Sequence, residues 1–427
     1  MNYFEAIDYL KGLTKFGINL GLDRIRELLR RLGDPHLKIK VIHVGGTNGK
    51  GSTVSMTASI LQAAGYKVGT FISPHLHRYS ERFCINGEEI SEEQVVALVT
   101  ELRPHLDNMA LEGFEHPTEF EVSTAMACFY FYQQQVDFAV LEVGLGGAID
   151  STNVVQPLVA VITNVSLDHM DYLGNTVREV AKVKAGIIKE GVPLVTATND
   201  PEALTVIEET CNEQKVPITI VGQDVTWQEK DGQLTVISKK HHYHGINLSL
   251  LGEHQRVNAA TAVATVEELH AYDVSITDDN VCKGLARVTW PGRFEVIMGN
   301  PTVVLDGAHN TEGARMLANT LKQQFPNRSI VLVLGMLGDK EREKVVSILT
   351  PLASTVVITK PNNPRSGDWQ RLAELAKNYV PKVDIIESIP KAVDKGLELA
   401  SKEDVVCITG SFYMLAEARE YLLKQRS

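Results

Sequence analysis

The chain has 427 residues, which is too long for one ordinary domain, so we expect two. Hydrophobic residues make up 44% and charged residues 22%, a balance that is typical of a soluble globular protein and argues against disorder. The formal net charge of −11 argues against a nucleic-acid partner, and local groups must hold any anionic substrate against an unfavourable overall field.

Cysteine usage and apolar runs bear on the location of the protein. The five cysteines are scattered and form no C-x-x-C pair, which favours reduced thiols over a disulfide framework or a zinc site. No run approaches the roughly 18 consecutive apolar residues of a membrane span. The opening MNYFEAIDYL lacks the layout of a signal peptide. We therefore expect a cytoplasmic protein without a membrane partner, and we expect a monomer.

The first part of the chain alternates short apolar runs with longer helical patterns. Ile25, Leu28, Leu29 and Leu32 repeat at helical spacing, and Gly33 ends that helix. The expected strands then cover residues 41–44, 68–72, 138–143, 158–163 and 194–197, and the expected helices 53–64, 91–106, 119–133 and 176–189. This alternation predicts βαβ units on a mostly parallel sheet. Residues 233–238 and 241–250 follow, and we expect them to form an antiparallel pair.

A second alternating set begins at Pro301, with the apolar runs TVVLD, SIVLVLG, STVVITK, KVDIIES and DVVCITG. The residues MGNP punctuate the chain just before it. We therefore expect an α/β protein with a P-loop-type, mostly parallel sheet domain over residues 1–298. A smaller Rossmann-like α/β domain is expected over residues 299–427.

The stretch VIHVGGTNGKGSTV has the layout of a phosphate-binding loop. A strand leads into a glycine-rich turn, and Lys50 and Ser52 precede a helical pattern. The common pattern G-x-x-x-x-G-K-[ST] does not fit, because Val44 replaces its first glycine and Gly51 separates the lysine from the hydroxyl. Backbone N–H groups and the helix N-terminus would still hold phosphates, while Lys50 reaches the outer phosphates and Ser52 a magnesium ion. The alternative is a plain glycine-rich turn.

The segment VLEVGLGGAIDSTN places Glu142 near the end of an apolar strand. A carboxylate there points to the edge of a parallel sheet where ligands bind, and it could hold a metal ion. A solvent-facing acid is the alternative. Gly144, Gly146 and Gly147 suggest that the backbone passes close to another group, although a tight turn would use them equally.

The next two segments offer a histidine and a lysine. His169 lies in a loop beside Asp168 and Asp171, and by itself it suits magnesium poorly, because magnesium prefers oxygen. Lys184 falls on the apolar face of its helix, so it must pair, lower its pKa or be modified. The alternative is that its amine extends to the surface, and the spacing leaves both open.

In the second block, VVLDGAHNTEGA repeats the strand-end arrangement. Asp306 ends an apolar strand, and His309 follows in the glycine turn before a helix. Arg293, in WPGRFE, lies just before the expected boundary. It could close on a phosphate, or it could form a surface salt bridge.

Together these segments resemble the folylpolyglutamate synthase and dihydrofolate synthase family of the Mur-ligase superfamily. The motifs that carry the resemblance occur in the family order: GTNGKGS, SPHLHRYSERFCINGEEI, HPTEFEVSTAMA, EVGLGGAIDSTN, LDHMDYLG, VKAGIIK, GEHQRVNA, WPGRFE, LDGAHNTEG, GMLGDKE and TGSFY. They run from about Gly21 to Tyr413, nearly the whole chain. The unusual glycine loop looks like the family's own phosphate loop, and the first domain resembles a Mur-ligase central domain.

The resemblance implies ATP as co-substrate. The residues that it assigns to ATP are Thr47, Asn48, Gly49, Lys50, Gly51, Ser52, Asn258, Arg293 and Asp306. His309 would lie near the γ-phosphate, and with Lys50 and Lys184 it makes up the implied catalytic set.

The resemblance also implies two Mg²⁺ ions, with K⁺ as an additional candidate ion. The implied metal ligands are Ser52, Ser73, Glu142, His169 and Lys184. Lys184 matches a family lysine that is carbamylated, and its apolar surroundings independently favour a neutral, reactive amine. Either Ser52 or Ser73 would bind the first ion.

The folate site would be bordered by Phe120, Thr118, His75 and Arg82. One residue departs from the family pattern. Ala148 follows EVGLGG where the family often has arginine, which leaves the preferred pterin and glutamyl chain open.

The implied reaction joins L-glutamate to a reduced folate or to dihydropteroate, with ADP and phosphate released. The γ-phosphoryl group would convert the folate carboxylate into an acyl phosphate, and the two domains should close over it to exclude water. Two alternatives remain open: a Mur-type ligase acting on a UDP-linked muropeptide, and a nucleotide-dependent switch ATPase. A Mur-type ligase would need a UDP-binding domain before the glycine loop, and only one helical segment precedes it here. A switch ATPase would not explain a second α/β domain with its own LDGAHN turn.

Overall fold

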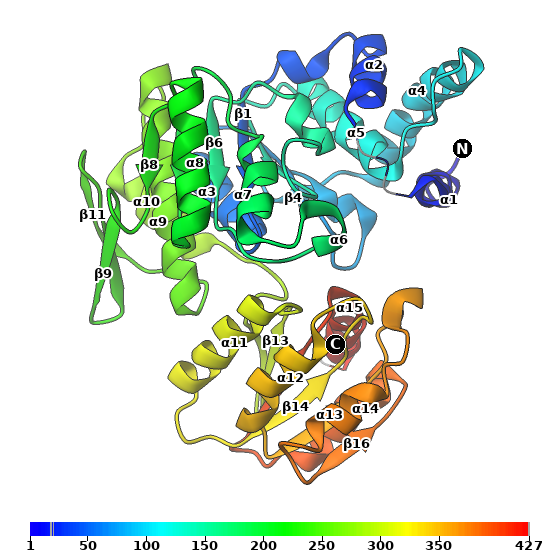
Figure 1. Cartoon of the computed structure of the whole chain (residues 1–427), viewed down its shortest axis with the longest axis vertical. Coiled ribbons are helices and arrows are strands. Elements are labelled where there is room, and N and C mark those ends of the chain that lie inside the picture. The colour runs from blue at the N-terminus through cyan, green and yellow to red at the C-terminus, as the bar shows by residue number, and fades with distance from the viewer. Residues whose placement is uncertain (18, 20, 426–427) are drawn as a thin grey trace. The chain divides into compact units, whose positions relative to one another are not determined.

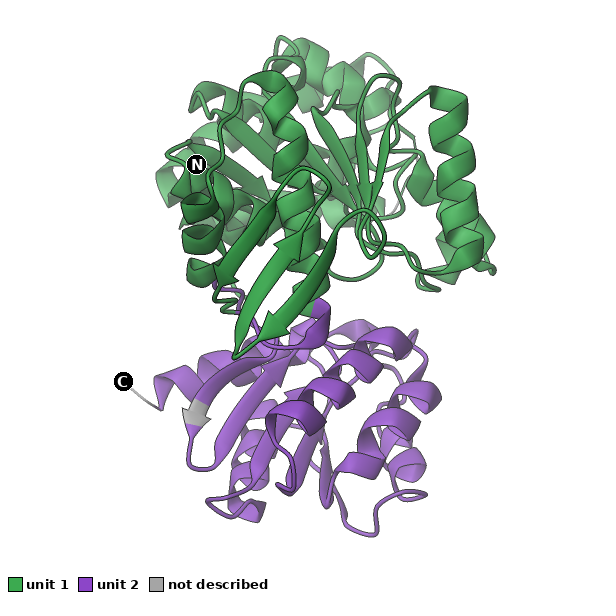
Figure 2. Ribbon diagram, turned by 90° about the vertical axis from the view of Figure 1, so that its left-hand side faces the viewer, with its two compact units in different colours: residues 1–249, 255–288 green, residues 250–254, 289–427 purple. Residues whose placement is uncertain are grey.

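The computed structural model describes residues 1–17, 19 and 21–425. Within this part of the chain there are two compact units (Figure 2). Unit 1 comprises Met1–Ser249 and Gln255–Val288, and unit 2 comprises Leu250–His254 and Thr289–Ser427. The expected boundary between residues 298 and 299 therefore falls inside unit 2. The reason is that β12 (Glu295–Gly299) pairs antiparallel with β13 (Thr302–Asp306), so MGNP marks a hairpin turn.

Unit 1 is built on an eight-stranded sheet in the order β4-β3-β2-β5-β1-β6-β7-β8 among the described residues (Figure 1). The strands are β1 (Val41–Gly45), β2 (Val68–Phe71), β3 (Phe83–Ile85), β4 (Glu88–Glu89), β5 (Phe138–Glu142), β6 (Val159–Ile162), β7 (Leu194–Thr196) and β8 (Ile218–Ile220). Only the pairings of β3 with β2 and with β4 are antiparallel in this sheet as described. The five expected strands and the mostly parallel sheet are confirmed.

Helices cover this sheet, so its strands are buried, as a parallel sheet requires. The helices of unit 1 are α1 (Tyr3–Gly12), α2 (Asp23–Arg31), α3 (Lys50–Ala63), α4 (Glu92–Leu111), α5 (Glu119–Gln133), α6 (Met170–Leu173), α7 (Val177–Ala185), α8 (Pro201–Gln214), α9 (Glu253–Glu268, which begins in unit 2) and α10 (Asp278–Arg287). Two expected bounds change. The helix expected from residue 53 begins at Lys50, and the helix expected to reach residue 189 ends at Ala185.

Hydrophobic clusters of described residues stabilise unit 1. One cluster joins α1, α2, α4 and α5 to β2 and β5, and another joins α7 and α8 to β6 and β7. A separate sheet holds β9 (Thr226–Lys230), β10 (Gln233–Ile237) and β11 (His242–Ile246) in antiparallel pairs. The expected hairpin is confirmed as β10 and β11, whereas β9 was not expected.

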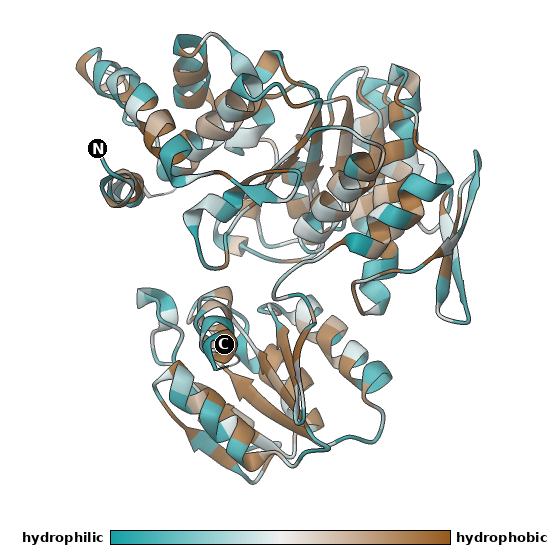
Figure 3. Ribbon diagram, turned by 180° about the vertical axis from the view of Figure 1, so that it is seen from behind, coloured by the Kyte–Doolittle hydropathy of each residue, from teal (hydrophilic) through white to brown (hydrophobic). Residues whose placement is uncertain are grey.

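Unit 2 has a six-stranded sheet in the order β12-β13-β17-β14-β15-β16 within the described residues. The elements after β13 are α11 (Thr311–Gln324), β14 (Ile330–Leu334), α12 (Arg342–Leu349), β15 (Thr355–Ile358), α13 (Arg371–Ala376), β16 (Val383–Ile385), α14 (Ile389–Leu399), β17 (Val405–Thr409) and α15 (Phe412–Lys424). Apart from the β12 edge the pairings are parallel. The central strands are strongly hydrophobic (Figure 3).

Short 3₁₀ turns connect several of these elements. They are η1 (Leu13–Phe16), η2 (Pro35–Leu37), η3 (Tyr79–Arg82), η4 (Ser151–Val154), η5 (Leu269–Tyr272), η6 (Thr350–Leu352) and η7 (Pro364–Ser366). None of the helices described for this chain combines the length and apolar character that crossing a bilayer would take.

Candidate active site

The glycine-rich turn between β1 and α3 requires glycine at two positions. Gly46 has φ of 136° and Gly49 has φ of 81°, values that favour glycine. A Cβ atom on Gly46 would lie 2.0 Å from Oγ1 of Thr163, and one on Gly49 would lie 2.5 Å from Oδ1 of Asn258. The glycines therefore allow both the backbone path and the close approach of neighbouring side chains.

Residues just after β6 hold this turn in place. The Asn48 N–H donates to Oδ1 of Asn164 at 2.9 Å, and the Thr163 hydroxyl donates to the Asn48 carbonyl at 2.7 Å. Thr47 donates through its hydroxyl to the Ser166 carbonyl at 3.1 Å. These hydrogen bonds hold the backbone of the turn in one conformation, which reduces the ordering cost of binding an anion.

The remaining predicted phosphate residues lie at the N-terminus of α3. Lys50 is its first residue, and its Nζ donates to the Thr47 carbonyl at 3.1 Å. Gly51 and Ser52 follow, and the Ser52 side chain is buried. A helix N-terminus with its N–H groups and partial positive charge is a suitable anion site.

Lys184 lies beneath the same turn. Its side chain is buried at 4% exposure, and its Nζ donates to the Gly46 carbonyl at 2.8 Å. Burial, followed by the positive charge of Lys50, lowers its pKa to about 7. The alternative that Lys184 extends to the surface is therefore wrong in this structure.

The loop after β5 passes close to the helix that carries Lys184. A Cβ atom on Gly147 would lie 2.7 Å from the Val183 carbonyl. The Ala148 N–H donates to that carbonyl at 2.9 Å, and the Asn153 amide donates to the Ala148 and Gly186 carbonyls at 3.1 and 3.0 Å. The sequence left open whether these glycines allow close backbone passage or form a tight turn. At Gly147 the structure shows close backbone passage. This contact fixes Lys184 relative to the loop.

Asp150, in the same loop, was missed by the sequence reasoning. It is buried, and it accepts hydrogen bonds from the Leu145 N–H at 2.7 Å and from the Thr152 N–H at 2.9 Å. Burial raises its pKa, against the effect of these hydrogen bonds. An aspartate whose side chain accepts from the backbone N–H two residues later forms a common turn. Asp150 and Thr152 have this spacing, which could have predicted the role of Asp150.

Glu142 ends β5 directly beside the glycine turn, because it stands opposite Val44 in the β1–β5 register. It is buried at 6% exposure, so the solvent-facing alternative does not hold. Its Oε2 accepts a hydrogen bond from the Ser73 N–H at 3.3 Å, which brings two predicted metal ligands together. His169 is at the start of α6 with its side chain 41% exposed, and its Nε2 is 4.0 Å from Oδ2 of Asp168.

The predicted folate residues gather around the start of α5. Thr118 caps this helix, and the Phe120 ring lies 5.9 Å from the Phe71 ring. Arg82 donates through Nε to Nδ1 of His75 at 3.0 Å. Burial, followed by the charge of Arg82, lowers the pKa of His75 to about 4.

Glu119 was missed, although it is the first residue of α5. Its Oε1 is 3.1 Å from Nη1 of Arg82 and accepts a hydrogen bond from the Tyr79 hydroxyl at 2.6 Å. It therefore balances the charge of Arg82 in this part of unit 1. In the sequence HPTEFE, Glu119 stands between the helix cap and an aromatic residue, a position that could have indicated its role.

In unit 2 the structure brings Arg293, Asp306 and His309 together. The buried Asp306 accepts from the Phe294 and Ala308 N–H groups, both at 2.9 Å. Burial raises the pKa of Asp306, while Arg293 opposes the rise. Nδ1 of His309 lies 2.9 Å from the Gly307 carbonyl. Asn258 belongs to unit 1, where its amide donates to Gln255 at 2.9 Å.

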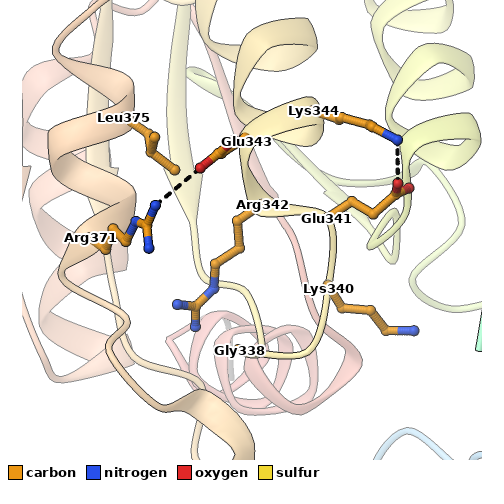
Figure 4. Close-up of a pocket in the computed structure, with 8 residues that line it drawn as sticks. All are labelled: Gly338, Lys340, Glu341, Arg342, Glu343, Lys344, Arg371 and Leu375. Atoms are coloured by element: carbon orange, nitrogen blue, oxygen red, sulfur yellow. Dashed lines mark hydrogen bonds and ion pairs between the residues drawn. The ribbon is translucent and has the colours of Figure 1, made fainter. Parts of the chain in front are cut away.

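Unit 2 also has a pocket at the start of α12 (Figure 4). Its charged lining is largely paired, with Lys344 on Glu341 at 2.5 Å and Arg371 on Glu343 at 3.1 Å. The predicted site residues do not line it.

Comparisons with known proteins place this architecture. Residues 44–266 match the family model "Mur ligase middle domain", and residues 292–412 match "Mur ligase, glutamate ligase domain". The dihydrofolate synthase/folylpolyglutamate synthase of Bacillus subtilis (strain 168) is 41% identical over 432 residues, covering 98% of this chain and 99% of that protein.

Solved structures agree along the whole chain. Escherichia coli FolC in complex with DHPP and ADP superposes with a TM-score of 0.91 at 31% identity, covering 100% of this chain and 99% of that one. Mycobacterium tuberculosis folylpolyglutamate synthase complexed with ADP gives a TM-score of 0.91 at 33% identity, with 99% of each chain covered. The chain belongs to the folylpolyglutamate synthase and dihydrofolate synthase family. It is thus a member of a family of ATP-dependent ligases within the Mur-ligase superfamily.

Magnesium, which the family resemblance implies, can be tested against the donor atoms present. Ser52, Ser73 and Glu142 offer oxygen atoms at or near the glycine turn, and oxygen is the ligand type that Mg²⁺ prefers. Lys184 as an amine is a hydrogen-bond donor and not a ligand. Within the described ranges, no group of three or more His, Cys, Asp or Glu side chains is arranged to hold a metal ion. The oxygen donors of Ser52, Ser73 and Glu142 are thus of the kind that fits Mg²⁺.

Proposed function

We propose that this protein adds L-glutamate to folates at the expense of ATP, and that it accepts both dihydropteroate and reduced folates. The observation that carries the proposal is the glycine turn with Lys50, Glu142 and Lys184 at the edge of one mostly parallel sheet. Full-length similarity to enzymes named for both activities supports it.

The residues of the glycine turn would hold ATP. N–H groups at the start of α3 and the Lys50 ammonium neutralise phosphate charge, and Arg293 contributes a second cation. Asn258, Asp306 and His309 complete the proposed nucleotide contacts. Ser52, Ser73, Glu142 and His169 would hold Mg²⁺, which when bound supplies further positive charge against the phosphates.

The proposed reaction has two steps. A folate carboxylate oxygen attacks the γ-phosphorus, and the bond to ADP breaks, so an acyl phosphate and ADP form. The glutamate nitrogen then attacks the acyl carbon and loses a proton, and the bond to phosphate breaks to leave an amide. Because water would hydrolyse the acyl phosphate, the groups that border the folate must exclude it.

We further propose that Lys184 is carbamylated in the active enzyme. Its amine has a pKa of about 7, so a large neutral fraction is available to react with carbon dioxide near neutral pH. The nitrogen–carbon bond forms with loss of one proton, and an oxygen anion replaces a cation beside the glycine turn.

The test is glutamate-dependent release of ADP, measured with dihydropteroate and separately with tetrahydrofolate. We expect activity with both, and activity with one alone would narrow the proposal to that substrate. Release of ADP only with a UDP-linked muropeptide, or without any acceptor, would instead support the Mur-type ligase or the switch ATPase.

A further inference from the structure

The TGSFY segment lies beside the LDGAHN turn in unit 2. Strands β13 and β17 are neighbours in the sheet and run parallel, with Asp306 opposite Thr409. The turns that follow them therefore leave the sheet at the same edge. Phe412, the first residue of α15, lies after one of these turns, and Gly307 and His309 lie in the other.

The Phe412 ring contacts both functional side chains of this region. The Arg293 guanidinium carbon lies 4.3 Å from the ring centroid, well within the range of a cation–π interaction. The His309 ring lies 5.7 Å away at an interplanar angle of 62°, an edge-to-face arrangement. One aromatic ring thus touches the proposed phosphate-binding arginine and the proposed γ-phosphate histidine.

Gly307 allows this arrangement. A Cβ atom there would lie 2.5 Å from Cζ of Phe412 and 2.6 Å from Nη1 of Arg293. Any larger residue would push the ring or the guanidinium away. Its φ is not among the positive values of this chain, so space and not backbone conformation requires the glycine.

We propose that Phe412 is a positioning residue that holds the Arg293 guanidinium in place for the nucleotide phosphates, with Gly307 providing the space. The proposal rests on the proposed function, in which Arg293 contacts the nucleotide. An arginine side chain has many rotamers, and holding one of them in advance reduces the entropy lost when phosphate binds.

The experiment compares Phe412→Leu with Phe412→Tyr in the full-length protein. Leucine fills similar space without a π face, whereas tyrosine keeps the ring. We expect Phe412→Leu to weaken ADP binding, measured by calorimetry, and to lower kcat/KM for ATP by about three- to thirtyfold. Phe412→Tyr should stay within about twofold of wild type. Tyr413→Leu, at the exposed neighbouring position, is the matched control and should change neither quantity.

A double-mutant cycle with Arg293→Ala separates positioning from a general effect on packing. If Phe412 acts through Arg293, Phe412→Leu should add little to the loss already caused by Arg293→Ala. Gly307→Ala should behave like Phe412→Leu, whereas Gly299→Ala, where a Cβ atom meets nothing within 4 Å, should be silent.

Stepwise fluorination of the Phe412 ring tests the interaction without changing shape, even if the leucine variant folds poorly. ADP affinity should fall as fluorine atoms are added, because they weaken the negative ring face. Equal affinity across that series, multiplicative losses in the cycle, or unchanged ADP affinity in Arg293→Ala would each overturn the inference. Because ADP binding needs no folate, failure of the proposed function would appear separately, as normal ADP binding without glutamate-dependent turnover.

Discussion

The glycine turn after β1 in unit 1 and the Asp306–Asn310 turn after β13 in unit 2 occupy equivalent places, each after a parallel strand and before a helix. They differ in what they present. The first has two glycines with positive φ, Gly46 and Gly49, and residues outside the turn hold its backbone. The second is held by Asp306, which accepts from the Phe294 and Ala308 N–H groups, and it presents side chains.

This difference has a physical reason. Backbone N–H groups can surround an anion closely only where no Cβ atom intervenes, so the first turn needs glycine and support from its neighbours. A side-chain site needs fixed rotamers instead, which buried hydrogen bonds and ring contacts provide. We therefore expect substitutions in the first turn to affect phosphate binding and fold together, except at Lys50, whose Nζ makes a local hydrogen bond to the Thr47 carbonyl.

The largest expected effect is that of Lys50→Ala. The variant should lose at least about a thousandfold in turnover, because a cation on the transferring phosphoryl group is removed. The melting temperature should stay near that of wild type, since Nζ of Lys50 donates to the Thr47 carbonyl, three residues away within the turn itself. Near-normal ligation by this variant would show that the turn is not the phosphate site.

Lys184→Ala should lower turnover by about a hundredfold, a loss of the size seen when groups that support a metal site are removed. Added acetate should restore part of the activity by supplying the oxygen anion that a carbamate would provide. Lys182→Ala is the matched control, because Lys182 lies on the same helix with an exposed side chain. Absence of a carbamate mass at Lys184 under bicarbonate, together with no acetate rescue, would contradict the carbamylation proposal.

Gly46→Ala tests whether the first turn needs glycine because a Cβ atom would clash with Thr163, as well as because of its positive φ. We expect a loss of about 3 kcal/mol in the free energy of unfolding, from positive φ and from the clash with Thr163. Gly65→Ala has a φ of 92° but no atom within 4 Å of the added Cβ, so it carries the conformational strain alone. It should lose about 1 kcal/mol in chemical denaturation. Equal losses would show that crowding at Gly46 is unimportant.

The smallest effect concerns the stability of the protein in acid, which depends on a histidine in β1, the strand before the first turn. His43 is buried, and burial, with a lesser effect of Lys189, lowers its pKa to about 3 from 6.5. Below pH 6.5 the unfolded chain binds a proton at His43 that the folded protein does not bind. The contribution of His43 to the free energy of unfolding is therefore complete above pH 6.5 and is lost as pH falls toward 3. His43 alone should cost about 2 kcal/mol between pH 7 and pH 5.

His43→Gln should remove that part of the pH dependence in denaturant titrations, and its amide can still donate to Thr152, which lies 2.8 Å from Nε2 of His43. His242→Gln, at an exposed position on β11, is the control and should leave the slope unchanged. The same slope in both variants would show that His43 is not the titrating group. The run TVVLD of β13 has no histidine, so this acid effect is specific to the first turn's strand.

The sequence by itself determined the alternation of strands and helices, the mostly parallel sheets and the glycine-rich turn between β1 and α3. These follow from local periodicity and from residues adjacent in the chain, such as the strand, glycines and lysine of VIHVGGTNGK. Helical spacing also placed Lys184 on the apolar face of its helix, beside Val180 and Ala181, but it left open whether the amine is buried or extends to the surface. The ordered motifs further identified the family.

Only the tertiary structure decided which distant groups meet. Lys184 donates to Gly46, Glu119 balances Arg82, and Phe412 contacts Arg293, each pair being separated by a stretch of chain that periodicity cannot bridge. The hairpin of β12 and β13 likewise depends on pairing across Asn300 and Pro301, which looked like a domain boundary. Local pattern sets the elements, whereas strand order and register set which strand ends, and therefore which side chains, come together.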